Sequence, residues 1–303
     1  MMRTQRHDHG IATLAATMLC ATIAAMLLCA AAPAQALGEA AQALRARHEA
    51  LRDEFAHSPF ERPLVLRSTQ SDDELTGDVY AVVEQPFTAT AAALADRTRW
   101  CELLILHLNI KDCHATAGAR GDALSLAIGR KHDRSAEGGQ RMEFAFRVPS
   151  VQPDYLQVQM AADSGPLGTR DHRLSLEVAP LTERSSFIHL TYAYGYGALA
   201  RMATQAYLAT AGRDKVGFTV TGQTADGRPR YIDGVRGMVE RNVMRYYLAI
   251  EAYLGALSVP PGERTDKRLR DWFAATERNA TQLHEVERDE YLAMKREAMQ
   301  RVQ

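Results

Sequence analysis

Alternating apolar and polar positions dominate the middle of the chain and predict β-strands. Two such segments, 63–68 and 75–83, flank a polar turn. Short strands separated by Gly and Pro are typical of an antiparallel meander. Six further strands are expected over 103–111, 122–128, 141–148, 155–161, 173–178 and 186–196.

Other segments repeat their apolar residues every three to four positions, which predicts helices. The strongest pattern lies over 233–257, where Val239, Tyr246 and Ile250 belong to one apolar stripe, and Pro260-Pro261-Gly262 ends it. The final helix is charged and has only sparse apolar contacts. The expected helices cover 39–55, 88–100, 198–211, 233–257 and 266–302.

The first 36 residues have the pattern of an export signal. A basic start precedes an uncharged apolar run over 11–32, and Ala34 and Ala36 supply the small residues of an A-x-A cleavage site. Cleavage there predicts a protein of the periplasm. Retention as an inner-membrane anchor and lipidation at Cys29 are the alternatives.

Composition and charge narrow the chemistry. The formal net charge of −1 gives no reason to expect a nucleic-acid partner. Of the four cysteines, Cys101 and Cys113 lie beyond the export signal, and an oxidising compartment predicts a disulfide between them. Two buried thiols are the alternative. No metal or cofactor is expected, because the spacing of these cysteines from His107 and His114 matches no common zinc pattern.

The element order resembles the helix-grip fold of the START-like, or polyketide-cyclase-like (SRPBCC), superfamily, in an exported bacterial member. The residues that carry this resemblance are Asp78-Val79-Tyr80-Ala81-Val82-Val83 leading into Pro86-Phe87, and Trp100 after the next helix. The resemblance implies an α+β fold, in which a curved antiparallel sheet wraps a long C-terminal helix, with extra flanking helices. The expected division is a signal peptide over 1–36, an N-terminal helical segment over 37–62, a START-like domain over 63–259 and a charged C-terminal helix over 260–303.

The same resemblance implies a ligand cavity between the sheet and the long helix. Apolar walls would bury the ligand and tyrosine hydroxyls would orient it. A closed core without a cavity is the alternative. The expected ligand-binding residues are Trp100, Phe144, Phe146, Tyr192, Tyr194, Tyr196, Met238 and Tyr246.

The leading hypothesis is periplasmic binding or carriage of a hydrophobic small molecule or lipid. No G-x-S-x-G, H-E-x-x-H, G-x-G-x-x-G or phosphate-loop motif indicates an enzyme. A cyclase- or hydrolase-type enzyme on the same scaffold is one alternative. Its single catalytic candidate is His107, which would share a strand face with Asn109 and Lys111, either at the cavity mouth or toward solvent. A second alternative is an envelope interaction module that contacts a protein or a membrane surface through the charged C-terminal helix.

Overall fold

The computed structural model describes residues 32–118, 121–210 and 212–301. Residues 1–31 of the expected export signal lie outside the described residues, so export and signal cleavage stay predictions. The chain divides into two units, Met1–Ala43 and Leu44–Gln303, and the fold from Leu44 onward belongs to the second. Within the described part of the chain, no helix combines the length and apolarity needed to cross a bilayer.

An eight-stranded antiparallel sheet is the main feature of the second unit, with the spatial order β1-β2-β8-β7-β6-β5-β4-β3. Ile188, Leu190 and Tyr192 of β8 are buried on its inner face, as the predicted alternation requires. The strands are β1 (Leu64–Gln70), β2 (Glu74–Val83), β3 (Ile110–Gly118), β4 (Gly121–Ile128), β5 (Gln140–Gln152), β6 (Tyr155–Ser164), β7 (Thr169–Pro180) and β8 (Ser186–Tyr196).

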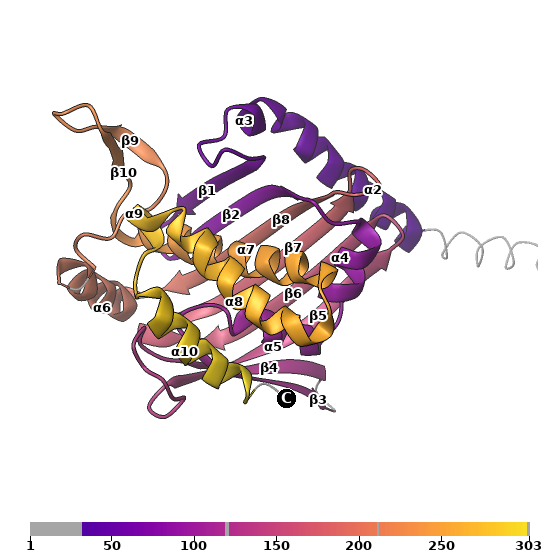
Figure 1. The fold of residues 1–303 in the computed structure, drawn as a ribbon. Coiled ribbons are helices and arrows are strands. Elements are labelled where there is room, and N and C mark those ends of the chain that lie inside the picture. Colours follow the sequence, from indigo (N-terminus) through magenta and orange to yellow (C-terminus); the bar gives the residue numbers. More distant parts are fainter. Residues whose placement is uncertain (1–31, 119–120, 211, 302–303) are drawn as a thin grey trace, which may run out of the picture. The chain divides into compact units, whose positions relative to one another are not determined.

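The long helix α7 lies against the inner face of this sheet, over β1, β2 and β8 (Figure 1). The two elements approach closely at Gly77 of β2, where an added Cβ would lie 2.9 Å from a methyl carbon of Val243. Glycine is therefore required there for the helix to seat on the strand. A curved antiparallel sheet that wraps a long helix confirms the predicted START-like helix-grip, α+β fold.

Further helices flank the sheet and α7, as predicted. Described helices are α2 (Ala32–Ala50), α3 (Arg52–Ala56), α4 (Phe87–Leu94), α5 (Arg97–Leu104), α6 (Ala198–Ala209), α7 (Gly234–Gly255), α8 (Pro261–Glu277), α9 (Ala280–Leu283) and α10 (Arg288–Met299), with the 3-10 helices η1 (Pro166–Gly168) and η2 (Ala256–Ser258). A separate hairpin, which the sequence did not predict in full, pairs β9 (Val220–Gln223) with β10 (Pro229–Tyr231).

The single helix predicted over 266–302 is wrong, because the chain forms α8, α9 and α10 there. Its apolar residues are sparse, and they are buried only when the chain folds back on itself. The rings of Trp272 in α8 and Tyr291 in α10 stack at 4.9 Å. The indole N–H of Trp272 also donates to the carbonyl of Arg245 in α7, which anchors α8 on the long helix.

The strand predicted over 103–111 is also wrong: the chain continues α5 to Leu104, turns, and begins β3 only at Ile110. Asp96 starts α5, since its side chain accepts the backbone N–H of Thr98. The apolar run that follows is buried throughout. A buried helix end and a buried strand have the same apolar pattern, so periodicity could not separate them.

The predicted disulfide is present between Cys101 of α5 and Cys113 of β3, with a Cα–Cα distance of 5.2 Å. The disulfide fixes α5 to β3, the edge strand of the sheet. Both residues are buried in the hydrophobic core.

Replacing both cysteines with serine should lower the free energy of unfolding by about 2–3 kcal/mol, because the bridge closes a loop with a sequence separation of 12 residues. Urea unfolding with and without dithiothreitol measures this. Dithiothreitol should not change the free energy of unfolding of the double-serine variant. An equal response of both proteins, or no response of either, would contradict a stabilising bridge.

Candidate functional site

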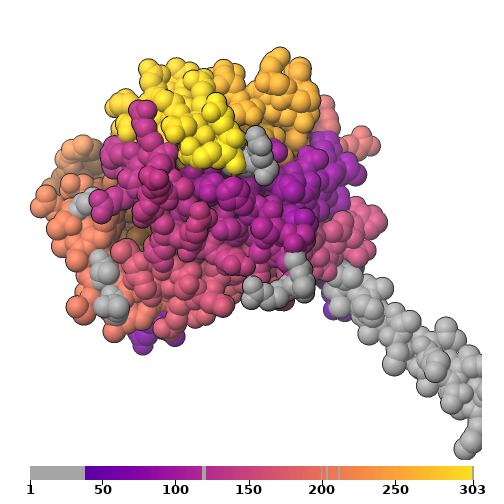
Figure 2. Space-filling model, turned by 90° about the horizontal axis from the view of Figure 1, so that it is seen from below, coloured from indigo at the N-terminus to yellow at the C-terminus, as the bar shows by residue number. Residues whose placement is uncertain are grey.

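A cavity of about 140 Å³ lies between the sheet and α7. In the space-filling view the surface is hollowed between α6 and the neighbouring strands (Figure 2). A deeper, almost wholly apolar space of about 10 Å³ adjoins it. Four residues line both spaces: Leu126, Phe144, Tyr192 and Tyr246. The larger space is also lined by His107, Asn109, Ile110, Ile128, Met142, Pro166, His172 and Asn242.

His107 forms the polar end of this cavity. It lies in the turn after α5, and its ring centroid is 4.9 Å from that of Tyr246. The backbone N–H of Asn109 donates to its Nδ1 (3.2 Å), so the neutral ring carries its proton on Nε2. Nε2 is buried and has no hydrogen-bond partner among the described residues. It therefore offers an unused N–H donor at the cavity.

The charge state of His107 follows from its surroundings. Burial, followed by the positive charges of Arg245, Lys295 and Lys111, holds the pKa of His107 well below its ordinary range. Lys295 is fully buried and donates to the carbonyls of His107 and Ile110 (2.6 and 2.7 Å). The imidazole is thus neutral at pH 7.

The expectation that His107, Asn109 and Lys111 form one strand face is wrong, because the strand does not exist there. Nor does the row face solvent: His107 and Lys111 are 4% and 1% exposed. Lys111 Nζ instead donates to the carbonyls of Leu108 (3.0 Å) and Lys131 (3.3 Å). Burial lowers the pKa of Lys111 to about 8. Of the three residues, His107 and Asn109 line the cavity.

A directed hydrogen-bond chain forms the opposite wall. The Thr169 hydroxyl donates to the carbonyl of Pro166 (2.6 Å) and therefore accepts from Nε2 of His172 (2.9 Å). Nδ1 of His172 then carries no proton and accepts a hydrogen bond from the Tyr192 hydroxyl (3.1 Å). The Tyr192 oxygen is also hydrogen-bonded to the Tyr246 hydroxyl, which leaves it one lone pair as an acceptor.

The pocket wall leaves no room behind His172. A Cβ on Gly165 would lie 2.1 Å from its Nε2, so only glycine fits there. Burial lowers the pKa of His172 to about 4 and raises the pKa of Tyr192 well above its usual range. Both side chains are therefore neutral at pH 7.

Taken together, the cavity holds a neutral donor, a neutral acceptor and apolar walls. General acid–base catalysis works best with a group whose pKa lies near the operating pH. Neither histidine that lines the cavity meets that condition. Among the described residues, no cluster of three or more His, Cys, Asp or Glu could hold a metal ion.

Three of the predicted ligand-binding residues, Phe144, Tyr192 and Tyr246, meet at this cavity. Trp100 is buried outside both cavity linings; its indole N–H donates to the carbonyl of Leu94 (2.7 Å), and its ring packs edge-on against Phe146. The remaining predicted residues, Tyr194, Tyr196 and Met238, lie outside both cavity linings.

The sequence analysis missed His172 and Asn242 as lining residues. The inner face of β7 carries Leu174, Leu176 and Val178, and extending the predicted strand 173–178 backward by one residue would have placed His172 on the same face. Asn242 lies on the predicted long helix, one turn before Tyr246, but a single polar residue on an apolar helix is not a specific sign of a ligand contact.

No family model matches the chain, and no curated protein matches its sequence. Solved structures with a similar arrangement include a truncated norcoclaurine synthase from Thalictrum flavum, with 14% identity, a TM-score of 0.33, and coverage of 48% of this chain and 90% of that one. Another is a START superfamily protein from Mycobacterium smegmatis, with 14% identity, a TM-score of 0.31, and coverage of 46% and 96%. The fold assignment rests on the sheet order and on α7 itself.

Proposed function

We propose that this protein binds a small, mainly apolar molecule that carries one hydroxyl or carbonyl group. The observation that supports this is the buried, unpartnered Nε2 of His107 at an otherwise apolar cavity. A buried polar group without a partner is unfavourable, and a ligand acceptor would satisfy it. The remaining lone pair of Tyr192 would accept the proton of a ligand hydroxyl.

The volume limits the ligand. A dry cavity of about 150 Å³ can hold benzene, whereas pockets for drug-sized ligands measure roughly 300–1,000 Å³. The cavity of about 140 Å³ therefore suits a single ring or the end of one acyl chain. Carriage of a lipid in the periplasm, the finer form of this proposal, requires both the predicted export and an opening of the cavity around α7.

Binding is favoured over catalysis in this proposal, because the groups at the cavity are neutral and far from titration at pH 7. Three probes of similar size separate the contacts. Phenol can accept from His107 and donate to Tyr192, benzaldehyde can only accept from His107, and toluene tests apolar burial alone. Isothermal titration of the full chain should rank phenol first and toluene last. Absence of binding by all three probes would overturn the proposal. Native mass spectrometry of protein from cells would show whether a lipid is retained.

The substitution Tyr192→Phe should weaken phenol binding about fivefold, since one hydrogen bond contributes roughly 1 kcal/mol. Toluene binding should stay unchanged. Tyr194→Phe is the matched control: it lies two residues along the same strand, outside the cavity, and its hydroxyl has no hydrogen-bond partner in the described residues. Equal loss of phenol affinity in both variants would mean that Tyr192 does not contact the ligand.

A further inference from the structure

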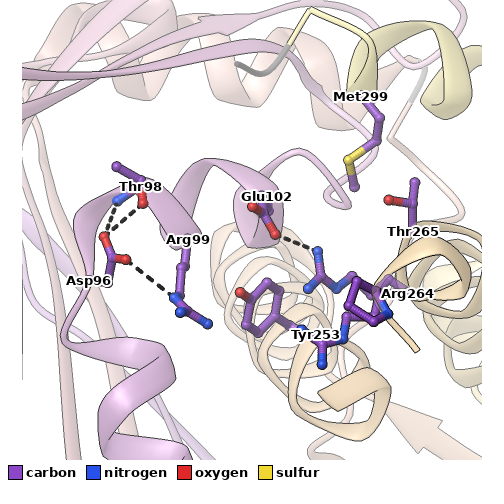
Figure 3. Close-up of a pocket in the computed structure, with 10 residues that line it drawn as sticks. Asp96, Thr98, Arg99, Glu102, Tyr253, Arg264, Thr265 and Met299 are labelled. Atoms are coloured by element: carbon purple, nitrogen blue, oxygen red, sulfur yellow. Dashed lines mark hydrogen bonds and ion pairs between the residues drawn. The ribbon is translucent and has the colours of Figure 1, made fainter. Parts of the chain in front are cut away.

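A second, larger pocket of about 480 Å³ lies away from the cavity, between α5, the end of α7, the first half of α8 and the end of α10. Its walls are mostly polar. Figure 3 shows Arg99 and Glu102 of α5 facing Tyr253 of α7 and Arg264 of α8 across it. Charged side chains from helices distant in the sequence thus converge on one hollow.

Three guanidinium groups and two carboxylates line this pocket. Arg99 Nε donates to Asp96 (3.2 Å), and Arg268 Nη1 donates to Glu102 (2.5 Å). Arg264 has no carboxylate partner among the described residues; it donates to the carbonyls of Val259 and Leu257 (3.1 and 3.4 Å). The pocket therefore keeps one uncompensated positive charge.

The guanidinium groups are held in place and retain free donors. Arg268 is 4% exposed, and its guanidinium carbon lies 4.0 Å from the centroid of the Tyr253 ring. Its Nε is buried with no hydrogen-bond partner in the described part of the chain. Arg99 engages Asp96 through Nε and also hydrogen-bonds to the Tyr253 side chain, which still leaves N–H groups of its guanidinium for another acceptor.

A fixed, fork-shaped set of N–H donors with excess positive charge matches an oxyanion, because guanidinium groups bind carboxylate and phosphate oxygens in pairs. We propose that this pocket binds the phosphate or carboxylate group of a small molecule, held by Arg264, Arg99 and Arg268. Pro261, Met299 and the Tyr253 ring form the wall for the apolar part of that molecule. The volume exceeds that of a bare phosphate and leaves room for an attached group.

The test is a titration of the full chain with inorganic phosphate, glycerol 3-phosphate and acetate, each against sodium chloride of equal ionic strength. Saturable heat and a raised thermal midpoint are expected with the oxyanions alone. Stronger binding of the phosphates than of acetate assigns the site to phosphate esters, and the reverse assigns it to carboxylates. No response beyond that of chloride overturns the proposal.

Arg264→Gln and Arg99→Gln should each weaken the better oxyanion at least about tenfold. Arg270→Gln is the control, since it removes the same charge from α8 but Arg270 is exposed, pairs with Asp266 and lies outside the pocket lining. Arg99 is partly exposed, so its variant should fold even if Arg264→Gln does not. Equal weakening by Arg99→Gln and Arg270→Gln would reduce the effect to general charge and overturn the site. Phenol binding in the cavity serves as an independent readout.

Discussion

Replacing Glu240 with alanine is expected to lower the free energy of unfolding by roughly 4 kcal/mol. This carboxylate is fully buried on α7 and accepts four hydrogen bonds. The donors are the Ser68 hydroxyl (2.6 Å), the Phe218 N–H (2.6 Å), and the N–H and hydroxyl of Thr219 (3.0 and 2.7 Å). Each hydrogen bond to a charged group is worth roughly 1.5–3 kcal/mol, and donors left buried without an acceptor add a further cost.

The same change should release the β9–β10 hairpin, because Glu240 holds the segment that leads into it. Urea unfolding gives the loss of stability, and trypsin cleavage after Arg230 reports the hairpin. Glu251→Ala is the control on the same helix: Glu251 is partly exposed and pairs with Arg62, so about 1 kcal/mol is expected. A loss no larger than that of the control would show that the four hydrogen bonds are not needed.

The inner face of the sheet could be predicted because alternation is a local property of the sequence. Alternation within the predicted strand 186–196 places Ile188, Leu190 and Tyr192 on one face, whatever the partner strands are, and all three are buried. The long helix was likewise predicted over 233–257 and observed as Gly234–Gly255. Periods of two and 3.6 residues suffice for such assignments.

Contacts between strands could not be predicted in the same way, because they depend on register. His189 lies opposite Tyr80 of β2 on one side and Glu177 of β7 on the other. Asp78, which it also contacts, is 111 residues away in the sequence. A slip of one residue would have moved every one of these side chains to the other face.

The polar end of the cavity was missed for a different reason. His107 was predicted on a strand, and that strand would have given it other neighbours. The chain is helical to Leu104, so His107 lies in the turn after α5, beside Tyr246. The oxyanion pocket could not be predicted, because Arg99 lies on α5 whereas Arg264 and Arg268 lie on α8, and the two helices are far apart in the sequence.

A charged cluster on the outer face of the sheet should make stability depend on pH. His189 lies between two carboxylates, with Nε2 2.8 Å from Asp78 and Nδ1 3.0 Å from Glu177. Both ring nitrogens must donate, so the bound form is the imidazolium. Tyr80 stacks on the ring at 4.2 Å, and the Tyr155 hydroxyl donates to Glu177 (2.6 Å).

The direction of the pH effect follows from the pKa shifts in the folded protein. Burial acts to lower the pKa of His189, but the hydrogen bonds to Asp78 and Glu177 outweigh it and raise the pKa. Burial acts to raise the pKa of each carboxyl group, but hydrogen bonds led by the one from His189 outweigh it and lower both. The contribution of His189 is therefore full below about pH 6.5 and is lost as the pH rises through its raised folded pKa. The contribution of the carboxylates is lost as the pH falls below about 4.

His189→Gln should lower the free energy of unfolding by roughly 3 kcal/mol at pH 6, because it leaves two partly buried carboxylates without their shared cation. The difference between wild type and variant should shrink as the pH rises above about 6.5 through the raised folded pKa of His189, where the wild-type ring loses its proton. Urea unfolding of both proteins from about pH 6 to 9 measures the difference at each pH. His284→Gln is the control, because His284 is an exposed histidine paired with Glu277, and it should change stability by no more than about 0.5 kcal/mol at any pH. A constant difference between wild type and His189→Gln from pH 6 to 9 would mean that the cluster is held by packing against Tyr80 and not by charge.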